Sequence, residues 1–200
     1  MSYAVRPADE ATWEDLAAIF GTRGPGSQCW CQRYRLGRGE SFGGFPAEER
    51  AARLRDQTDC DNPGSGTTSG LVAYDVSRDP AEPVGWCAVA PRSSYDGLVR
   101  VFRVPWEGRD EDRADDSVWA VTCLFVRAGH RRRGVSRALA AAAVDHARAG
   151  GARAVEAYPI TRTDVIGEEL HVGTVATFEA AGLVEVARPG TRRVVMRLDF

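Results

Sequence analysis

The order of elements between residues 117 and 158 constrains the fold more than any other feature of the sequence. Residues 117–126 are apolar without alternation, which predicts a strand covered on both faces. Residues 134–149 carry apolar side chains at helical spacing and end at a pair of glycines, and residues 154–158 form a second strand. Because a whole helix connects the two strands, we expect them to be parallel and joined by a right-handed crossover.

The rest of the 200-residue chain consists of short elements separated by loops. A helix after Asp9, with Asp9 as its expected cap, carries Trp13, Leu16, Ala17 and Phe20 on one face. In chain order we further expect a strand at 3–6, a long ordered loop or a loop with a helical turn at 21–45, and a helix at 46–57. Antiparallel strands at 71–76 and 84–90, an irregular stretch at 91–116, a short helix at 172–181 and a hairpin of 183–186 with 192–198 follow.

The fold class that follows is mixed α/β (α+β). It has a twisted, mostly antiparallel sheet with one parallel β-α-β step, and helices on both faces. No internal repeat and no shift in composition divides the chain, so we expect a single domain over residues 1–200.

Charge and hydropathy exclude several classes of partner. The chain has 28 acidic residues and 26 basic ones, all of them arginine, and its net charge of −2 argues against a nucleic-acid-binding protein. The longest apolar run is about half of what a membrane span needs, and the acid-containing N-terminal segment lacks the pattern of a signal peptide. We therefore expect a cytoplasmic protein with neither a membrane nor a nucleic acid as its partner.

The five cysteines are expected to be free thiols, because no export signal accompanies them. Cys29-Trp30-Cys31 resembles half of a zinc site, but a structural zinc ion needs four ligands and the three histidines are scattered. We expect no metal.

The turn before the helix at 134–149 concentrates positive charge. Five arginines fall within residues 127–137, which contain no acidic residue. The first N–H groups of a helix lack internal partners and attract anions, and the small residues Gly134 and Ser136 let a phosphate approach the backbone. The sequence therefore predicts a phosphate-binding turn, with basic residues on a solvated helix start as the alternative.

This turn also carries a resemblance to a known family. Arg131-x-x-Gly134-x-Ser136 after an apolar strand resembles the Arg/Gln-x-x-Gly-x-Gly/Ala motif of the GNAT superfamily of acetyl-CoA-dependent N-acetyltransferases. The order of elements over residues 71–198 is similar to that of the family as well.

A second motif supports the resemblance and also departs from it. Phe178-x-x-x-Gly182-Leu183 is similar to the family's Tyr-x-x-x-Gly-Phe, but Phe178 stands where many members have the tyrosine thought to protonate the leaving thiolate. Ser136 replaces the usual glycine or alanine and is still small.

The resemblance implies a V-shaped split between the strands at 117–126 and 154–158. The pantetheine arm of acetyl-CoA would lie in the split and its pyrophosphate on the turn, and a strand amide near Leu124 would stabilise the oxyanion when an amine attacks the thioester. The implied acetyl-CoA-binding residues are Leu124, Phe125, Val126, Arg131, Arg132, Arg133, Gly134, Val135, Ser136 and Arg137.

Two further side chains are candidates for proton transfer. Strand alternation puts Glu156 and Tyr158 on one face beside the implied split. We expect Glu156 to accept the proton of the amine, directly or through water, and Tyr158 to donate one in place of Phe178. The alternative for Glu156 is an ion pair with an arginine. Cys123 lacks a partner histidine, and we interpret it as a buried thiol.

Two groups of side chains have an open assignment. Trp30, Tyr34, Trp86 and Tyr95 either line an acceptor site or belong to the core. The acidic stretch at 107–116 is either a solvated loop or a rim that attracts an amine.

With the resemblance, the sequence predicts an acyltransferase that moves an acetyl group from acetyl-CoA to a primary amine of a small molecule, a peptide or a protein. A non-catalytic acyl-CoA-binding sensor or interaction module on the same fold is the alternative. An RNA or DNA contact through the arginines is a third and weaker hypothesis. The resemblance is also compatible with a homodimer.

Overall fold

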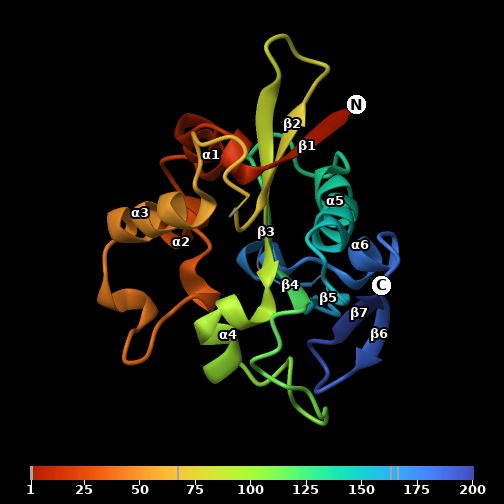
Figure 1. Cartoon of the computed structure of the whole chain (residues 1–200). Coiled ribbons are helices and arrows are strands. Elements are labelled where there is room, and N and C mark those ends of the chain that lie inside the picture. The colour runs from red at the N-terminus through yellow and green to blue at the C-terminus, as the bar shows by residue number, and fades with distance from the viewer. Residues whose placement is uncertain (1, 67, 163, 166) are drawn as a thin grey trace.

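One seven-stranded sheet organises the molecule (Figure 1), in a computed structural model that describes residues 2–66, 68–162, 164, 165 and 167–200. The strand order is β1-β2-β3-β4-β5-β7-β6, and every neighbouring pair is antiparallel except β4 with β5. This confirms the predicted mixed sheet with one parallel step. The strands are β1 (Tyr3–Pro7), β2 (Leu71–Asp75), β3 (Glu82–Pro91), β4 (Val118–Val126), β5 (Ala154–Ala157), β6 (Val184–Ala187) and β7 (Val195–Asp199).

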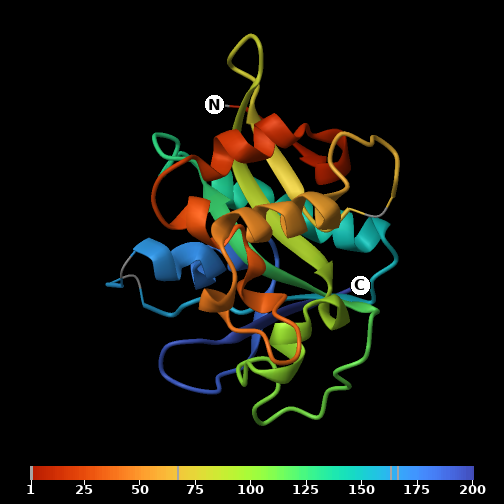
Figure 2. The ribbon, with the colours of Figure 1, turned by 90° about the vertical axis from the view of Figure 1, so that its left-hand side faces the viewer.

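Helices cover both faces of the sheet, as predicted (Figures 1 and 2). The side chains of α5 form one apolar core with the sheet, and those of α1 and α3 form a second core on the opposite face. The α-helices are α1 (Trp13–Phe20), α2 (Pro25–Cys29), α3 (Ala47–Thr58), α4 (Asp96–Arg100), α5 (Val135–Ala149) and α6 (Val175–Glu179). None of the helices in the described ranges has the length and apolar character to cross a bilayer.

Capping decides where α1 begins, and here the prediction was wrong. The helix starts at Trp13 with Thr12 as its cap, not Asp9, which lies in a 3-10 turn. Thr12 Oγ1 accepts from the Asp15 N–H at 3.1 Å, and the Asp15 carboxylate accepts from the Thr12 N–H at 3.4 Å. This reciprocal pair satisfies two N–H groups that would otherwise lack partners, which favours the later start.

Two other segments differ from the predicted pattern. The stretch at 91–116 was expected to be irregular, but it contains α4, a five-residue helix. The helix expected at 172–181 is shorter, because α6 covers only Val175–Glu179, and a separate 3-10 helix at Gly167–Val172 precedes it.

A bulge in β4 marks the point where β4 and β5 part. The pairing with β3 advances from Ala88 opposite Cys123 to Val89 opposite Val121, so Thr122 is an extra residue in β4. The pairing with β5 ends at Val121 opposite Ala157, while β4 continues to Val126 beside β3. In the described part of the chain, this end of β4 therefore has a strand on one side only.

Candidate functional site

The turn between β4 and α5 places two residues in the left-handed backbone region. Arg132 has φ 61° and Gly134 has φ 89°, and α5 begins directly after, at Val135. No side chain caps the first turn of α5, and that turn contains no acidic residue. The Arg137 N–H donates to the Gly134 carbonyl at 3.1 Å, so the N–H groups of Val135 and Ser136 and the positive end of the 15-residue helix are left for an external anion.

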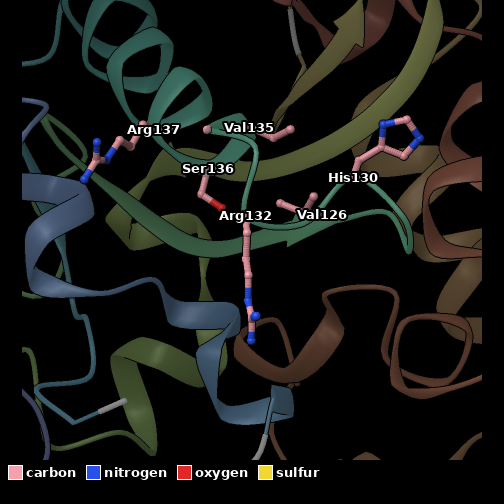
Figure 3. A pocket seen from close by; sticks show the side chains of 7 residues that line it. Val126, His130, Arg132, Val135, Ser136 and Arg137 are labelled. Atoms are coloured by element: carbon pink, nitrogen blue, oxygen red, sulfur yellow. The ribbon is translucent and has the colours of Figure 1, made fainter. Parts of the chain in front are cut away.

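An open pocket of about 380 Å³ lies at this turn. Figure 3 shows Ser136 pointing from the first turn of α5 toward the side on which Arg132 extends from the loop. A Cβ built on Gly134 would meet no atom within 4 Å, so the space in front of the turn is open. The lining residues are Val126, His130, Arg132, Gly134, Val135, Ser136 and Arg137.

A close approach of backbone to helix holds this turn against the sheet. A Cβ on Gly85 of β3 would lie 2.6 Å from Val135 Cγ1 and 3.1 Å from Leu139 Cδ1. The first separation is too short for real atoms and the second is tighter than most, so the first turns of α5 rest this closely on β3 because residue 85 lacks a side chain.

The structure brings six of the ten predicted acetyl-CoA-binding residues into this pocket, and the other four lie outside its lining. The side chains of Leu124 and Phe125 pack into the two cores, where Phe125 stacks on Phe20 at 5.3 Å between ring centroids. Arg131 and Arg133 are exposed, and the carbonyl of Arg133 accepts from the Tyr3 hydroxyl at 3.0 Å. Leu124 and Phe125 can therefore serve the site through their backbone alone.

His130 lines the pocket and was not among the predicted residues. It is buried, its Nε2 lies 3.5 Å from Glu82 Oε1, and its Nδ1 has no hydrogen-bond partner in the described part of the chain. Its position between the strand end and Gly134 is the sequence signal that could have indicated it.

Glu156 lies in a buried cluster of opposite charges. Its carboxylate accepts from Arg109 at 2.5 Å, Arg197 at 2.8 Å and Arg92 at 3.1 Å, and no part of its side chain is exposed. The ion pair that we gave as the alternative for Glu156 is thus present, with three arginines. Glu111 binds the same three arginines, so the predicted acidic stretch is partly built into this cluster.

The surroundings of Glu156 keep it ionised. Burial on its own would raise the pKa of the carboxyl group, but the hydrogen bond and charge of Arg109 and the charge of Arg92 outweigh burial and lower the pKa below its ordinary value. A carboxylate with a lowered pKa and no exposed surface is a poor acceptor for the proton of an external amine.

Tyr158 lies beside Glu156, as strand alternation predicted. Its hydroxyl donates to Glu156 Oε2 at 2.9 Å, and the residue is buried. Burial first, and then the negative charge of Glu156, raise the pKa of Tyr158 well above its ordinary value. Phe178 is buried in the α5 core and supplies no alternative donor.

The four aromatic residues that were expected either to line an acceptor site or to belong to the core are all buried. Trp30 and Trp86 belong to the core under α1, and Tyr34 and Tyr95 to a third apolar cluster near α4. Cys123 is buried too, and its Sγ lies 2.9 Å from Cys31 Sγ. Within the described ranges, no group of three or more histidine, cysteine or acidic residues could hold a metal ion.

Comparison with known proteins gives one family and one fold. A family model described as the acetyltransferase (GNAT) family matches residues 34–165. No curated protein matches the chain.

Three solved structures illustrate the shared fold at low identity. A GCN5-related N-acetyltransferase from Kribbella flavida is 17% identical with a TM-score of 0.54, over 99% of this chain and 98% of its own. The yncA protein of Salmonella typhimurium, solved with its cofactor acetyl-CoA, is 13% identical with a TM-score of 0.55, over 100% of this chain and 94% of its own. A ribosomal-protein-alanine N-acetyltransferase from Brucella melitensis is 14% identical with a TM-score of 0.54, over 98% of this chain and 99% of its own.

Proposed function

Because the chain belongs to the GNAT family of acetyltransferases, we propose that it transfers an acetyl group from acetyl-CoA to a primary amine. The observation that carries the proposal is the uncapped N-terminus of α5, which opens into a basic pocket beside the unpaired end of β4. The yncA structure, which contains acetyl-CoA, supports the same donor for this chain.

The residues of the turn are suited to the pyrophosphate of acetyl-CoA. Backbone N–H groups at Val135 and Ser136 would donate to its oxygens, and Arg132 and Arg137 would add charge and side-chain donors. The unpaired backbone of Leu124 to Val126 would bind the amide groups of the pantetheine arm, as an added strand does.

The transfer forms a C–N bond and breaks a C–S bond. An N–H group of β4 near Leu124 would stabilise the negative charge that develops on the carbonyl oxygen. An aliphatic amine with a pKa of ~10.4 is protonated at pH 7, and its deprotonation costs about 4.6 kcal/mol. The site therefore has to bind the neutral amine or accept its proton.

Proton transfer through Glu156 and Tyr158 stays a prediction, and their surroundings favour a different role. Both are buried, and the carboxylate of Glu156 is already bound by three arginines. We infer that Glu156 anchors these arginines next to β4 and that water accepts the proton of the amine.

A pair of glycine variants tests the donor site. Gly134→Glu puts a carboxylate into the pocket, and we expect calorimetry to show that acetyl-CoA binding is abolished. Gly129→Glu is the matched control, because Gly129 lies in the same turn with φ 87° and open space around it but does not line the pocket. Equal affinity of the two folded variants would contradict the proposed donor site.

A non-catalytic acyl-CoA-binding protein is the second candidate. The observation in its favour is that Phe178, Glu156 and Tyr158 leave no exposed proton relay among them. Release of CoA thiol from acetyl-CoA in the presence of a panel of primary amines separates the candidates. An enzyme releases thiol in proportion to the amine, whereas a sensor binds acetyl-CoA without turnover.

A further inference from the structure

Arg35 has an incompletely bound guanidinium group in the segment between α2 and α3, directly after a 3-10 turn at Gln32–Tyr34. Its Cζ lies 4.4 Å from the centroid of the Tyr95 ring, and its Nη1 donates to the Ser94 carbonyl over a long 3.4 Å. Its Nη2 is buried and has no hydrogen-bond partner, and no acidic residue pairs with it in the described part of the chain. The side chain as a whole is half-buried.

Arg50 shows what a structural arginine of the same region looks like. It is more deeply buried than Arg35, and it donates to the carbonyl groups of Gln28, Phe42 and Phe45 at 2.6–2.7 Å. The contrast indicates that Arg35 has donor capacity that this fold does not use.

Tyr95 adds a second donor, under the guanidinium group of Arg35. The residue is fully buried, and its hydroxyl faces the Thr122 side chain without forming a well-aligned hydrogen bond in the described ranges. Burial raises the pKa of Tyr95 to about 12, so the hydroxyl keeps its proton at neutral pH. A buried guanidinium nitrogen without a partner and a poorly satisfied hydroxyl, in two residues that contact each other, are costly unless a ligand binds them.

A close contact at Gly97 holds the segment with Arg35 against the helix that follows Tyr95. A Cβ on Gly97 of α4 would lie 3.0 Å from the Tyr34 carbonyl oxygen and 3.2 Å from the Leu36 amide nitrogen. The backbone around Arg35 therefore rests directly on α4, immediately after Tyr95. Figure 2 shows the loop in orange crossing in front of α4 in yellow-green.

The pair lies at the point where β4 and β5 part. The Tyr95 hydroxyl faces the side chain of Thr122, the bulge residue of β4, and Tyr95 packs in one apolar cluster with Ala120 and Tyr158. This is the inner end of the unpaired edge of β4, two residues before Leu124, near which the oxyanion is assigned.

We propose that Arg35 and Tyr95 form a subsite for a carboxylate of the acceptor, so that the acceptor is a small amine that also carries a carboxylate, such as an amino acid. The inference rests on the proposed acetyl transfer. One guanidinium donor and one phenol donor match the two oxygens of a carboxylate, and the positive charge selects an anion over a neutral amide.

Matched pairs of acceptors test the subsite. The probes are the common L-amino acids and their carboxamides, each tested for thiol release from acetyl-CoA and for calorimetric binding to the CoA-loaded protein. We expect the wild-type protein to prefer at least one acid over its carboxamide by about 10-fold or more, which is the size expected for a charge-assisted hydrogen bond.

Variants assign that preference to the subsite. Arg35→Met should remove most of the preference by raising KM for the acid while leaving the carboxamide unchanged, and Tyr95→Phe should reduce it. Arg38→Met is the matched control, since Arg38 is exposed three residues further along the same loop. Melting temperatures and acetyl-CoA affinities of all variants show whether they fold and bind the donor.

Each outcome has a defined meaning. An acid preference that Arg35→Met abolishes and Arg38→Met retains supports the subsite. Three results overturn it. The protein uses acids and carboxamides equally, it turns over only those amines that lack a carboxylate, or no acid binds to the CoA-loaded protein. Failure of acetyl-CoA to bind the wild-type protein would instead contradict the proposed function.

Discussion

The buried carboxylate of Glu156 and the guanidinium groups of three arginines neutralise one another's charge. Arg92, Arg109 and Arg197 converge on it from β3's end, the 101–116 loop and β7, with Arg92 and Glu156 both fully buried. Removing one partner of a buried ion pair leaves charge uncompensated, which typically costs about 3–5 kcal/mol. The residue therefore matters to stability whatever it does in transfer.

We expect Glu156→Gln to lower the free energy of unfolding by several kcal/mol at pH 7, and Tyr158→Phe to lower it by about 0.5–1.5 kcal/mol, the contribution of one hydrogen bond. Chemical denaturation measures both. Because the pKa of Glu156 is lowered on folding, its stabilisation is present above its unfolded pKa of ~4.3 and is lost as pH falls through the folded value. The difference between wild type and Glu156→Gln should thus narrow at acid pH; a constant difference from pH 7 to pH 3 would contradict this.

The same variants separate an anchor from a proton acceptor. If Glu156 anchors the arginines, the pH profile of kcat/KM keeps its shape in a folded Glu156→Gln variant, although its height falls. If Glu156 accepts the proton of the amine, the variant loses rate most strongly at low pH, and more than Tyr158→Phe does. The profiles become measurable once the amine panel identifies an acceptor.

At the scale of elements, the position of α5 depends on the absence of a side chain on β3. We expect Gly85→Ala to lower the free energy of unfolding by about 1–3 kcal/mol, as overpacking does, because its Cβ would collide with Val135 and Leu139. It should also weaken acetyl-CoA binding, since the first turn of α5 would be displaced.

Gly190→Ala is the control for this change. Gly190 is exposed, has no atom within 4 Å of a built Cβ and has no left-handed φ, so the substitution should change stability by less than about 0.5 kcal/mol. Denaturation and calorimetry on both variants test the prediction. Wild-type acetyl-CoA affinity in a measurably destabilised Gly85→Ala variant would show that the first turn of α5 is not displaced.

The sequence predicted elements better than the contacts between them. The β4-α5-β5 unit was predictable because its apolar runs are long and a helix connects them, and the neighbouring positions of Glu156 and Tyr158 follow from strand alternation. The sequence did not predict the bulge at Thr122 or the three arginines around Glu156, because both depend on pairing between segments that are far apart in the chain.

At the scale of the whole molecule, local charge outweighs net charge. The chain carries −2 overall, yet five arginines lie within residues 127–137 without an acidic neighbour in that segment. Their field attracts a polyanion such as acetyl-CoA and is screened by salt, with a Debye length of about 10 Å at 0.1 M.

We therefore expect acetyl-CoA affinity to fall as ionic strength rises from about 20 to 200 mM, and to fall less steeply in Arg132→Ala. S-acetyl-pantetheine, which lacks the pyrophosphate, is the uncharged comparison and should show little dependence. Calorimetry over a salt series measures the slopes. Parallel slopes for the two ligands would contradict a charge-based donor site.

The parting of β4 and β5 has a consequence for the group that is transferred. In the plane of the sheet, the opening ends where the main chains of β4 and β5 pair, at Val121 opposite Ala157. Such an end is a fixed stop, so an acyl chain that is several carbons longer than acetyl would have to turn out of the plane of the sheet. Room for a longer acyl chain in the plane of the sheet would thus require a change of strand register.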